Sequence, residues 1–432
     1  MKRIITFTLV LSMILCGCAN VGNNNRNSSE QPSIIDSSSD KINNPSNESP
    51  SQSTNIPSTP FVHDVSNFDW SVKLADAIYA KNQDNILFSP LSLNMALGMA
   101  ESFAEGDTKV ELDEYLNTND YKDFAQKYLM YIKKAYNYET SYGFEESYKS
   151  MFEIANSMWL NSEYTPSSYA KDILNNYFNG NIESINFGNP NEACGIINNW
   201  VAKKTYDMIK EIVTPNNIDI DTTAILTNSL YFESAWAKSW SLIDEYFTNL
   251  DGSQGIPLMT SKATTYYENE QAIAFGKHYA NGLMFIGILP NEEGDFELSS
   301  LNIESLLKSY GMEYSEVIAY MPSELNYDCN INIIKDFFID NGLSSPFEKM
   351  EFQNIVKEDK NLYISDILQK CKIELDKDGT RAAAVTAIVM ESNAMVEKDP
   401  PKVVKLDRPF AYLIYDEGHD QILFIGKVIT TK

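Results

Sequence analysis

Residues 377–396 read KDGTRAAAVTAIVMESNAMV, and the conformation of this stretch decides the fold. As a helix, residues 381–390 would have fair propensity, but they would lack a polar face and a cap, and several of them are β-branched. As a strand, the segment has two sides, because side chains alternate. One side carries Thr380, Ala382, Ala384, Thr386 and Ile388. These side chains are small or apolar and uncharged, so this side could face a core. Periodicity alone leaves both readings open.

The bulk composition sets limits on the rest of the molecule. The chain has 432 residues, of which 43% are hydrophobic and 12% aromatic, so it can bury a large core. The formal net charge of −26 disfavours binding to nucleic acid or to anionic lipid headgroups. Any contact with a membrane is therefore expected to be covalent or hydrophobic.

The N-terminus offers such a contact. Two cations, Lys2 and Arg3, precede an apolar stretch over residues 4–15 that is too short to span a bilayer and is typical of a secretion signal. The sequence Leu-Cys-Gly-Cys at 15–18 resembles the bacterial lipobox, which implies cleavage after residue 17 and a lipid on Cys18. The protein is then expected to be exported and lipid-anchored to the outer face of the membrane, or extracellular. An ordinary signal peptide with incidental cysteines is the alternative.

Residues 18–63 follow as a lipidated segment dominated by Asn, Ser, Pro and Gln. Because it has too little apolar surface to offset its ordering entropy, we expect a disordered tether. Residues 64–432 then form one domain without an internal linker. Its cysteines are Cys194, Cys329 and Cys371. An odd number without paired spacing favours packing thiols, and one disulfide remains the alternative.

The pattern after residue 64 changes from helical to extended. Apolar residues from 68 to 79 recur at helical spacing, Ser89 followed by Pro90 is a helix start, and Thr108 with Glu111 predicts a capping box. Short, continuously apolar runs in the middle of the chain predict strands covered on both faces. Two β-rich runs flanking Glu-Gly-His near the C-terminus predict a hairpin. Helices early and strands late indicate an α+β fold.

Nothing in the motifs indicates an enzyme. The histidines at 63, 278 and 419 are too sparse for a metal site or a catalytic triad, and no HExxH, GxSxG or glycine-rich phosphate loop occurs. We therefore expect neither catalysis nor a cofactor or metal. A hydrolase built on a carboxylate pair among the acidic residues is a third reading, without any constellation to support it.

Five segments together resemble the serpin family of serine protease inhibitors, over about residues 65–430. They are Asn85-x-x-x-Ser89-Pro90-x-Ser92, Ile197-Asn198-x-Trp200-Val201, Asn228 with Tyr231-Phe232 and Trp236, Asp378-Gly379-Thr380-x-Ala382-Ala383-Ala384-x-Thr386, and Arg408-Pro409-Phe410 with Leu423-Phe424-x-Gly426. Each is weak alone, but all five occur in the family's order and spacing. The resemblance favours a strand held outside its sheet, in a reactive-centre loop over about residues 377–405, next to a large central mixed sheet.

The resemblance implies a role for individual residues. The loop would be cut by a protease and would then insert into the sheet through a hinge made of Gly379, Thr380, Ala382, Ala383, Ala384 and Thr386. Family spacing places the cleaved bond at Asn393–Ala394, within a range from Met390 to Val396. A polar latch under the parting strands would be Ser89, Ser92, Asn228 and Gln369. Trp236 and Lys377 would lie at the breach, where insertion begins.

This chain departs from the family pattern at several of these positions. Gln369 stands where a histidine is usual, and it cannot titrate near pH 6. Lys377 replaces an acidic residue whose usual lysine partner falls on Ser323, so that ion pair is absent; Glu324 is a candidate partner for Lys377. Arg381 replaces a glutamate and is expected to be exposed.

The implied partner is a serine endopeptidase. Because MESNAMV contains no Arg or Lys, the expected targets are elastase-, chymotrypsin- or subtilisin-like, and a papain-like cysteine protease remains an alternative. The inhibitor would be a monomer. A serpin fold that does not inhibit, acting as a surface binding module, is the alternative function.

Overall fold

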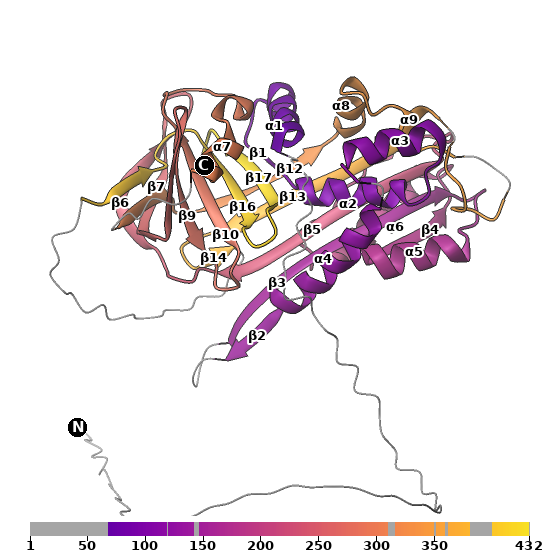
Figure 1. Cartoon of the computed structure of the whole chain (residues 1–432), viewed down its shortest axis with the longest axis horizontal. Coiled ribbons are helices and arrows are strands. Elements are labelled where there is room, and N and C mark those ends of the chain that lie inside the picture. Colours follow the sequence, from indigo (N-terminus) through magenta and orange to yellow (C-terminus); the bar gives the residue numbers. More distant parts are fainter. Residues whose placement is uncertain are drawn as a thin grey trace, which may run out of the picture. The chain divides into compact units, whose positions relative to one another are not determined.

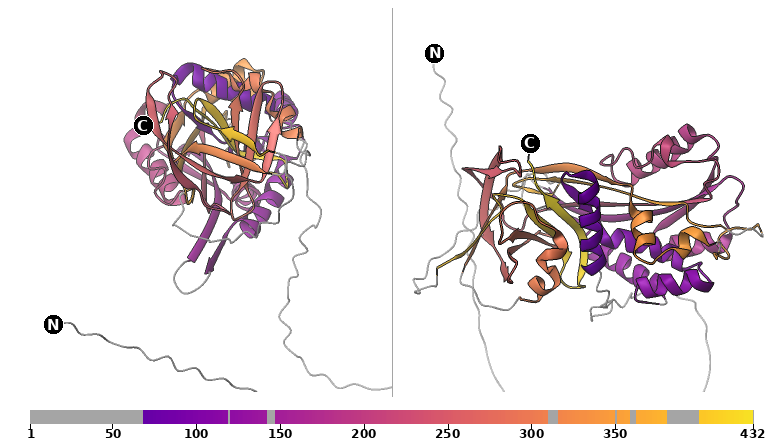
Figure 2. Two further views of the ribbon diagram at one scale, coloured as in Figure 1. Left: turned by 90° about the vertical axis from the view of Figure 1, so that its left-hand side faces the viewer. Right: turned by 90° about the horizontal axis from the view of Figure 1, so that it is seen from above.

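The chain folds into helices packed on three β-sheets, which confirms the predicted α+β class. A computed structural model describes residues 68–118, 120–141, 147–309, 316–349, 351–358, 362–380 and 400–431. These residues belong to one compact unit, Pro57–Lys432. Within it, the four- and six-stranded sheets lie toward one end and helices α4 and α5 toward the other (Figure 2).

The elements alternate along the chain (Figure 1). The helices are α1 Phe68–Asn82, α2 Pro90–Glu101, α3 Gly106–Tyr115, α4 Tyr121–Ala135, α5 Ser168–Phe178, α6 Pro190–Lys204, α7 Ile303–Lys308, α8 Ile334–Asp340 and α9 Ser345–Glu348, with 3-10 turns η1 Pro215–Asn217 and η2 Leu298–Leu301. The strands are β1 Ile86–Phe88, β2 Tyr138–Ser141, β3 Ser147–Asn161, β4 Gly180–Ile185, β5 Ala224–Ala235, β6 Ser241–Thr248, β7 Gln254–Ala263, β8 Thr265–Glu268, β9 Ala272–His278, β10 Met284–Pro290, β11 Val317–Pro322, β12 Leu325–Ile331, β13 Asp366–Leu375, β14 Gly379–Thr380, β15 Lys402–Lys405, β16 Phe410–Asp416 and β17 Gln421–Val428.

The seven-stranded sheet is mixed and crosses the unit. Its order is β12-β13-β14-β5-β3-β2, with β4 added parallel to β3. The other sheets have the orders β1-β17-β16-β10-β9-β8 and β15-β11-β7-β6. The predicted C-terminal hairpin is confirmed, since β16 pairs antiparallel with β17 across a turn at 417–420.

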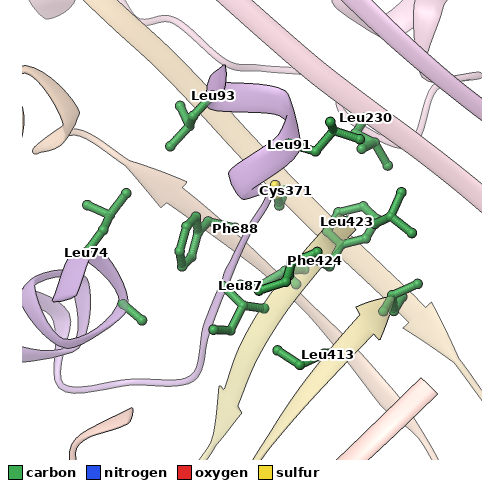
Figure 3. Packing of buried hydrophobic residues seen from close by; sticks show 14 of the residues in the cluster. Leu74, Leu87, Phe88, Leu91, Leu93, Leu230, Cys371, Leu413, Leu423 and Phe424 are labelled. Carbon is green, nitrogen blue, oxygen red and sulfur yellow. The ribbon is translucent and has the colours of Figure 1, made fainter. Parts of the chain in front are cut away.

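Apolar side chains cover both faces of the seven-stranded sheet, as the continuous hydrophobic runs predicted. On one face, Ile197 and Val201 of α6 join a cluster with Trp159 and Ile225. On the other face, residues of β1, α2, β5, β13 and the β16–β17 hairpin form the main core (Figure 3). The second face of the sheet is therefore buried against the six-stranded sheet, which limits the size of any side chain added there.

Of the two helix starts predicted from capping residues, the one at Ser89 is confirmed and the one at Thr108 is wrong. Ser89 caps α2, because its hydroxyl accepts a hydrogen bond from Ser92 N at 3.2 Å. The capping box at Thr108 and Glu111 is wrong. Helix α3 already begins at Gly106, and Glu111 instead accepts hydrogen bonds from the backbone of Ser345 and from its hydroxyl. The carboxylate of Glu111 is therefore used in a tertiary contact and is not available to cap α3. Among the described residues, no helix is long and apolar enough to cross a membrane.

Candidate functional site: a split between two strands

Strands β5 and β13 are joined at one end and separated at the other. At the joined end they pair directly and in parallel, from Asp366 opposite Ile225 to Gln369 opposite Asn228. At the other end the short strand β14 lies between them. Thr380 of β14 pairs antiparallel with Ser234 of β5 and with Leu375 of β13. The first residues of the predicted hinge, Gly379 and Thr380, therefore already occupy a place in the sheet.

Between these two ends lies a stretch without cross-strand pairing. Within the described parts of both strands, no pairing joins residues 229–233 of β5 to residues 370–374 of β13. A small cavity of about 10 Å³ opens here. Its lining is Phe232, Lys372, Ile373, Thr380, Ile414 and Phe424. The split thus ends on the main core, in a space that admits only a small side chain.

Trp236, predicted to lie at the breach, contacts the turn that precedes β14. Its backbone N donates to the Asp378 carbonyl at 3.0 Å, and its Nε1 donates to the Asp376 carbonyl at 2.9 Å. The indole stacks on Tyr279 with ring centroids 4.3 Å apart. The Tyr279 hydroxyl lies 2.8 Å from the Thr380 hydroxyl, so this stack connects directly to the seated hinge residue.

Lys377 does not pair with its candidate partner Glu324 in the described structure. Lys377 instead forms an ion pair with its neighbour Asp378, at 2.7 Å, and this hydrogen bond raises the pKa of the lysine. Ser323 donates its backbone N to the Pro257 carbonyl at 2.9 Å. An exposed pair between adjacent residues contributes little to stability, so the breach is held by Trp236 and Tyr279 rather than by charge.

The four latch residues lie at the joined end, but only two are linked through a side-chain amide. The Gln369 amide accepts from Ser89 N at 3.0 Å and donates to the Ser89 carbonyl at 3.0 Å, in the buried interior. Asn228 lies opposite Gln369 in the ladder, yet its side chain donates to Asn156. The hydroxyl of Ser92 is buried without a hydrogen-bond partner among the described residues. Glutamine thus fills the usual histidine position with an uncharged clamp on α2.

Sequence reasoning missed Asn156, Tyr279 and Asp376. None carries a local signature, because each contributes through a strand register or a turn that only the folded chain defines. The buried His419 was correctly placed in a turn; its Nδ1 lies 3.1 Å from Asp416, which also accepts from Tyr128, so the group ties α4 to the hairpin. Across the described ranges, no cluster of His, Cys, Asp and Glu could hold a metal ion.

A larger hollow, with a volume of about 490 Å³, lies elsewhere, between α4, α5 and β3. It contains none of the predicted site residues, and its mixed polar and apolar lining shows no catalytic arrangement. Several predictions fall outside the described residues. These are the hinge positions Ala382, Ala383, Ala384 and Thr386, the bond Asn393–Ala394, Arg381 and Cys18.

Comparison with known proteins gives the family of this chain. The family model described as Serpin (serine protease inhibitor) matches residues 65–431. The chain belongs to the serpin family, whose members are mostly inhibitors rather than catalytic enzymes.

The relatives cover most or all of the chain. An uncharacterised serpin-like protein of Thermococcus kodakarensis is 28% identical over the whole of both chains. Human neuroserpin is 26% identical over 84% of this chain and 90% of its own. The native-state structure of the thermophilic serpin tengpin superposes with a TM-score of 0.71 at 29% identity, covering 86% of this chain and 96% of tengpin. The complex of thyroxine-binding globulin with thyroxine shares the fold, with a TM-score of 0.69 at 19% identity over 85% of this chain and 98% of that one.

Proposed function

We propose that this serpin inhibits a serine endopeptidase as a suicide substrate. The protease attacks the loop after β14 with its own nucleophile and forms an acyl-enzyme. The freed strand then continues from β14 into the split between β5 and β13, and it carries the attached protease with it before water releases the ester. The observation that supports this most is the seated position of Thr380 between Ser234 and Leu375.

The register of β14 defines where each following residue would go. In an antiparallel ladder, one step forward on a strand is one step back on its partner. Since Thr380 lies opposite Ser234 and Leu375, the next residue reaches Glu233 and Glu374, and Ala382 reaches Phe232 and Ile373. Residues 381–385 would therefore fill the unpaired stretch, and Thr386 would be the first to separate Asn228 from Gln369.

The inward side of this register fits the space below it. Residues directly opposite each other in a ladder share a face, and Thr380, Ser234 and Leu375 are all buried. Ala382 would place its methyl group toward Phe232 and Ile373, which line the small cavity. Burying alanine there adds apolar contact without strain, whereas a longer or charged side chain would be overpacked or desolvated.

On the outward side of the inserted strand, Arg381 would be complementary in charge to its neighbours. The half-buried carboxylates of Glu233 and Glu374 flank the position that Arg381 would take. The unusual arginine would thus meet two carboxylates, where the family's usual glutamate would meet like charges. One step further, Ala383 would lie beside Tyr231 and Lys372. The replacement of glutamate by arginine therefore favours insertion in this chain.

The energy for the movement comes from ladder hydrogen bonds and apolar burial that the uncut chain does not make. The uncut protein is then trapped behind a barrier and gains stability once the loop is cut. We propose export with a lipid on Cys18 as the setting, and an elastase-, chymotrypsin- or subtilisin-like enzyme as the target class, on the basis of the N-terminal and loop sequences.

Mixing the purified protein with subtilisin or elastase tests the proposal. We expect a covalent species at the summed mass on a denaturing gel, and a melting temperature that rises sharply in the loop-cut protein. A catalytically inactive protease, treated identically, should give no covalent species and serves as the control. Clean loop cleavage without a covalent species and without thermal stabilisation would overturn the proposal.

A non-inhibitory binding module is the second candidate. It is favoured by the fold neighbour crystallised with thyroxine, which shows that this fold also occurs in a ligand carrier. The uncharged, small inward residues of the hinge favour inhibition over this alternative.

A further inference from the structure

Cys329 and Cys371 lie directly opposite each other on neighbouring strands. The antiparallel pairing of β12 with β13 places Cys329 against Cys371. Both side chains are buried, with 4% and 1% of their surface exposed, so both point toward the core. The backbone of Leu87 lies within hydrogen-bond reach of the Cys329 thiol, and the backbone of Ser89 lies within reach of the Cys371 thiol. Both sulfurs therefore lie beside β1 and the start of α2. Figure 3 shows the Cys371 sulfur among Leu87, Phe88 and Leu91.

The geometry of such a pair suits a disulfide. Residues directly opposite in an antiparallel ladder have Cα atoms about 4.5 to 5.5 Å apart, within the range of about 4.4 to 6.8 Å found across disulfides. Both thiols are free in this structure. The third described cysteine, Cys194, belongs to the separate cluster around α6, on the other face of the sheet. The strand register therefore defines one pairing among the described cysteines.

We propose that Cys329 and Cys371 are a disulfide site that clamps β12 to β13 in an oxidising environment. A disulfide supplied from outside, such as glutathione disulfide or that of an oxidoreductase, is the oxidant. One cysteine thiolate attacks a sulfur of this oxidant and releases one thiolate, leaving a mixed disulfide on the protein. The second cysteine, after losing its proton, attacks the protein sulfur of the mixed disulfide and releases a second thiolate. Two protein thiols are oxidised, and one disulfide is reduced to two thiols that take up the two protons.

Access to the thiols determines when this happens. Burial raises the pKa of both thiols, and the charge of Cys329 raises that of Cys371 further, so the folded pair reacts slowly. However, β12 is the edge strand of the seven-stranded sheet, next to β13. Local opening of an edge strand requires less free energy than unfolding of the whole domain. The exchange is therefore expected during folding or while β12 is open, and the finished disulfide is then shielded from reductants.

The clamp would act next to the split. Its Cys371 side lies two residues from Gln369, on the strand that parts from β5. With β12 and β13 covalently joined, the sheet opens between β13 and β5 and not at the β12–β13 ladder. This consequence rests on the proposed inhibition, whereas the clamp itself needs only an oxidising environment.

Disulfide mapping tests the site. The full chain is refolded from mild denaturant in a glutathione redox buffer, alkylated under denaturing conditions, digested and analysed by mass spectrometry. We expect one linked peptide pair joining Cys329 to Cys371, lighter by two hydrogens than the two reduced peptides and lost after dithiothreitol. Cys194→Ala, the matched control, should keep the link, and Cys371→Ala should abolish it. Separate alkylation of the two cysteines in the wild type, or a link to Cys194, would overturn the proposal.

A second readout does not depend on the single variant folding. The urea midpoint of the oxidised wild type should fall when dithiothreitol is added, because the cross-link restricts the unfolded chain. The midpoint of the double variant Cys329→Ala/Cys371→Ala should not respond to dithiothreitol. An equal response in both proteins would also overturn the clamp. Neither measurement involves a protease, so failure of the clamp and failure of inhibition are distinguishable.

Discussion

The hydroxyl oxygens of Tyr279 and Thr380 lie 2.8 Å apart in the interior, where the hinge enters the seven-stranded sheet. Tyr279 is also stacked on Trp236, whose indole N–H holds the turn before β14. The hinge residue Thr380 is thus fixed by one hydrogen bond to a stacked ring as well as by its ladder pairs.

Removing the Tyr279 hydroxyl should loosen this attachment. In Tyr279→Phe the buried Thr380 hydroxyl loses its partner, which should lower the free energy of unfolding by about 1–2 kcal/mol. Urea unfolding measures the loss, and hydrogen exchange at the Thr380 amide should become faster. Tyr169→Phe, at an exposed tyrosine, is the control and should change neither. Unchanged exchange at Thr380 would show that the ladder alone holds β14.

Adjacent alanines should respond differently to the same charge. Ala382→Glu would place a carboxylate toward the small cavity lined by Phe232 and Ile373, so insertion should stall and the protein should be cleaved as a substrate. Ala383→Glu would face outward beside Lys372 and should leave inhibition nearly unchanged. The stoichiometry of inhibition is the measurement, and we expect it to rise at least about tenfold for Ala382→Glu only, since a barrier increase above about 1.4 kcal/mol suffices. Equal effects at both positions would contradict the register.

The charge of Arg381 should matter only after cleavage. In Arg381→Glu, three carboxylates would meet on the outer face of the inserted strand, and like charges directly opposite each other in a sheet are destabilising. The melting temperature of the loop-cut protein should therefore fall, while that of the intact protein stays the same. Adding Glu374→Lys to Arg381→Glu should restore the cut form. If reversing the charge lowered both melting temperatures equally, Arg381 would act in the uncut protein instead.

The Gln369 clamp should stabilise the joined end of the split. Gln369→Ala leaves the buried N–H of Ser89 without its acceptor, which should cost about 2 kcal/mol. Because β5 and β13 then part more readily, the intact protein should also lose inhibitory activity faster on storage. Gln126→Ala removes one surface contact to the Asn176 carbonyl and should do neither. If Gln369→Ala kept its inhibitory activity on storage as long as the wild type does, the Gln369 clamp would stabilise the fold without controlling the separation of β5 from β13.

Asp366, at the joined end of the split, should make stability depend on pH. Burial raises its pKa from 3.8 to about 6, although the Ile367 N–H and Lys335 favour the charged form. The native state therefore holds more protons than the unfolded chain between these pH values, so the free energy of unfolding falls as pH rises from about 4 to about 6. Above that range the loss is complete.

Replacing the Asp366 carboxyl by an amide should remove this pH-dependent loss of stability. Asp366→Asn is expected to exceed the wild type at pH 7 by at most about 3 kcal/mol and to match it at pH 4, since a shift of one unit corresponds to about 1.4 kcal/mol. Urea unfolding at both pH values measures the difference, with the exposed Asp172→Asn as control. A difference that is the same at pH 4 and pH 7 would rule out titration of Asp366.

The sequence predicted those features that arise from local chemistry or repeated patterns. The cap at Ser89, the buried strands and the hairpin all follow from residue spacing and local pattern. It could not predict that Glu111 binds Ser345, that Lys377 pairs with Asp378, or that two cysteines share a rung of the sheet. Those contacts depend on which strands are neighbours and in what register, and this information exists only after the chain has folded.

The seated Thr380 changes the kinetic problem that the loop has to solve after the cut. Bringing a loop to a sheet costs entropy, and in the proposed mechanism Thr380 has already made this contact before an enzyme arrives. What remains is zipping from a fixed origin, a unimolecular process whose duration is set by the few rungs that must open beyond Gln369. If the protein inhibits as proposed, the outcome of each encounter depends on whether strand insertion or hydrolysis of the ester is faster, and the seated Thr380 shortens the insertion.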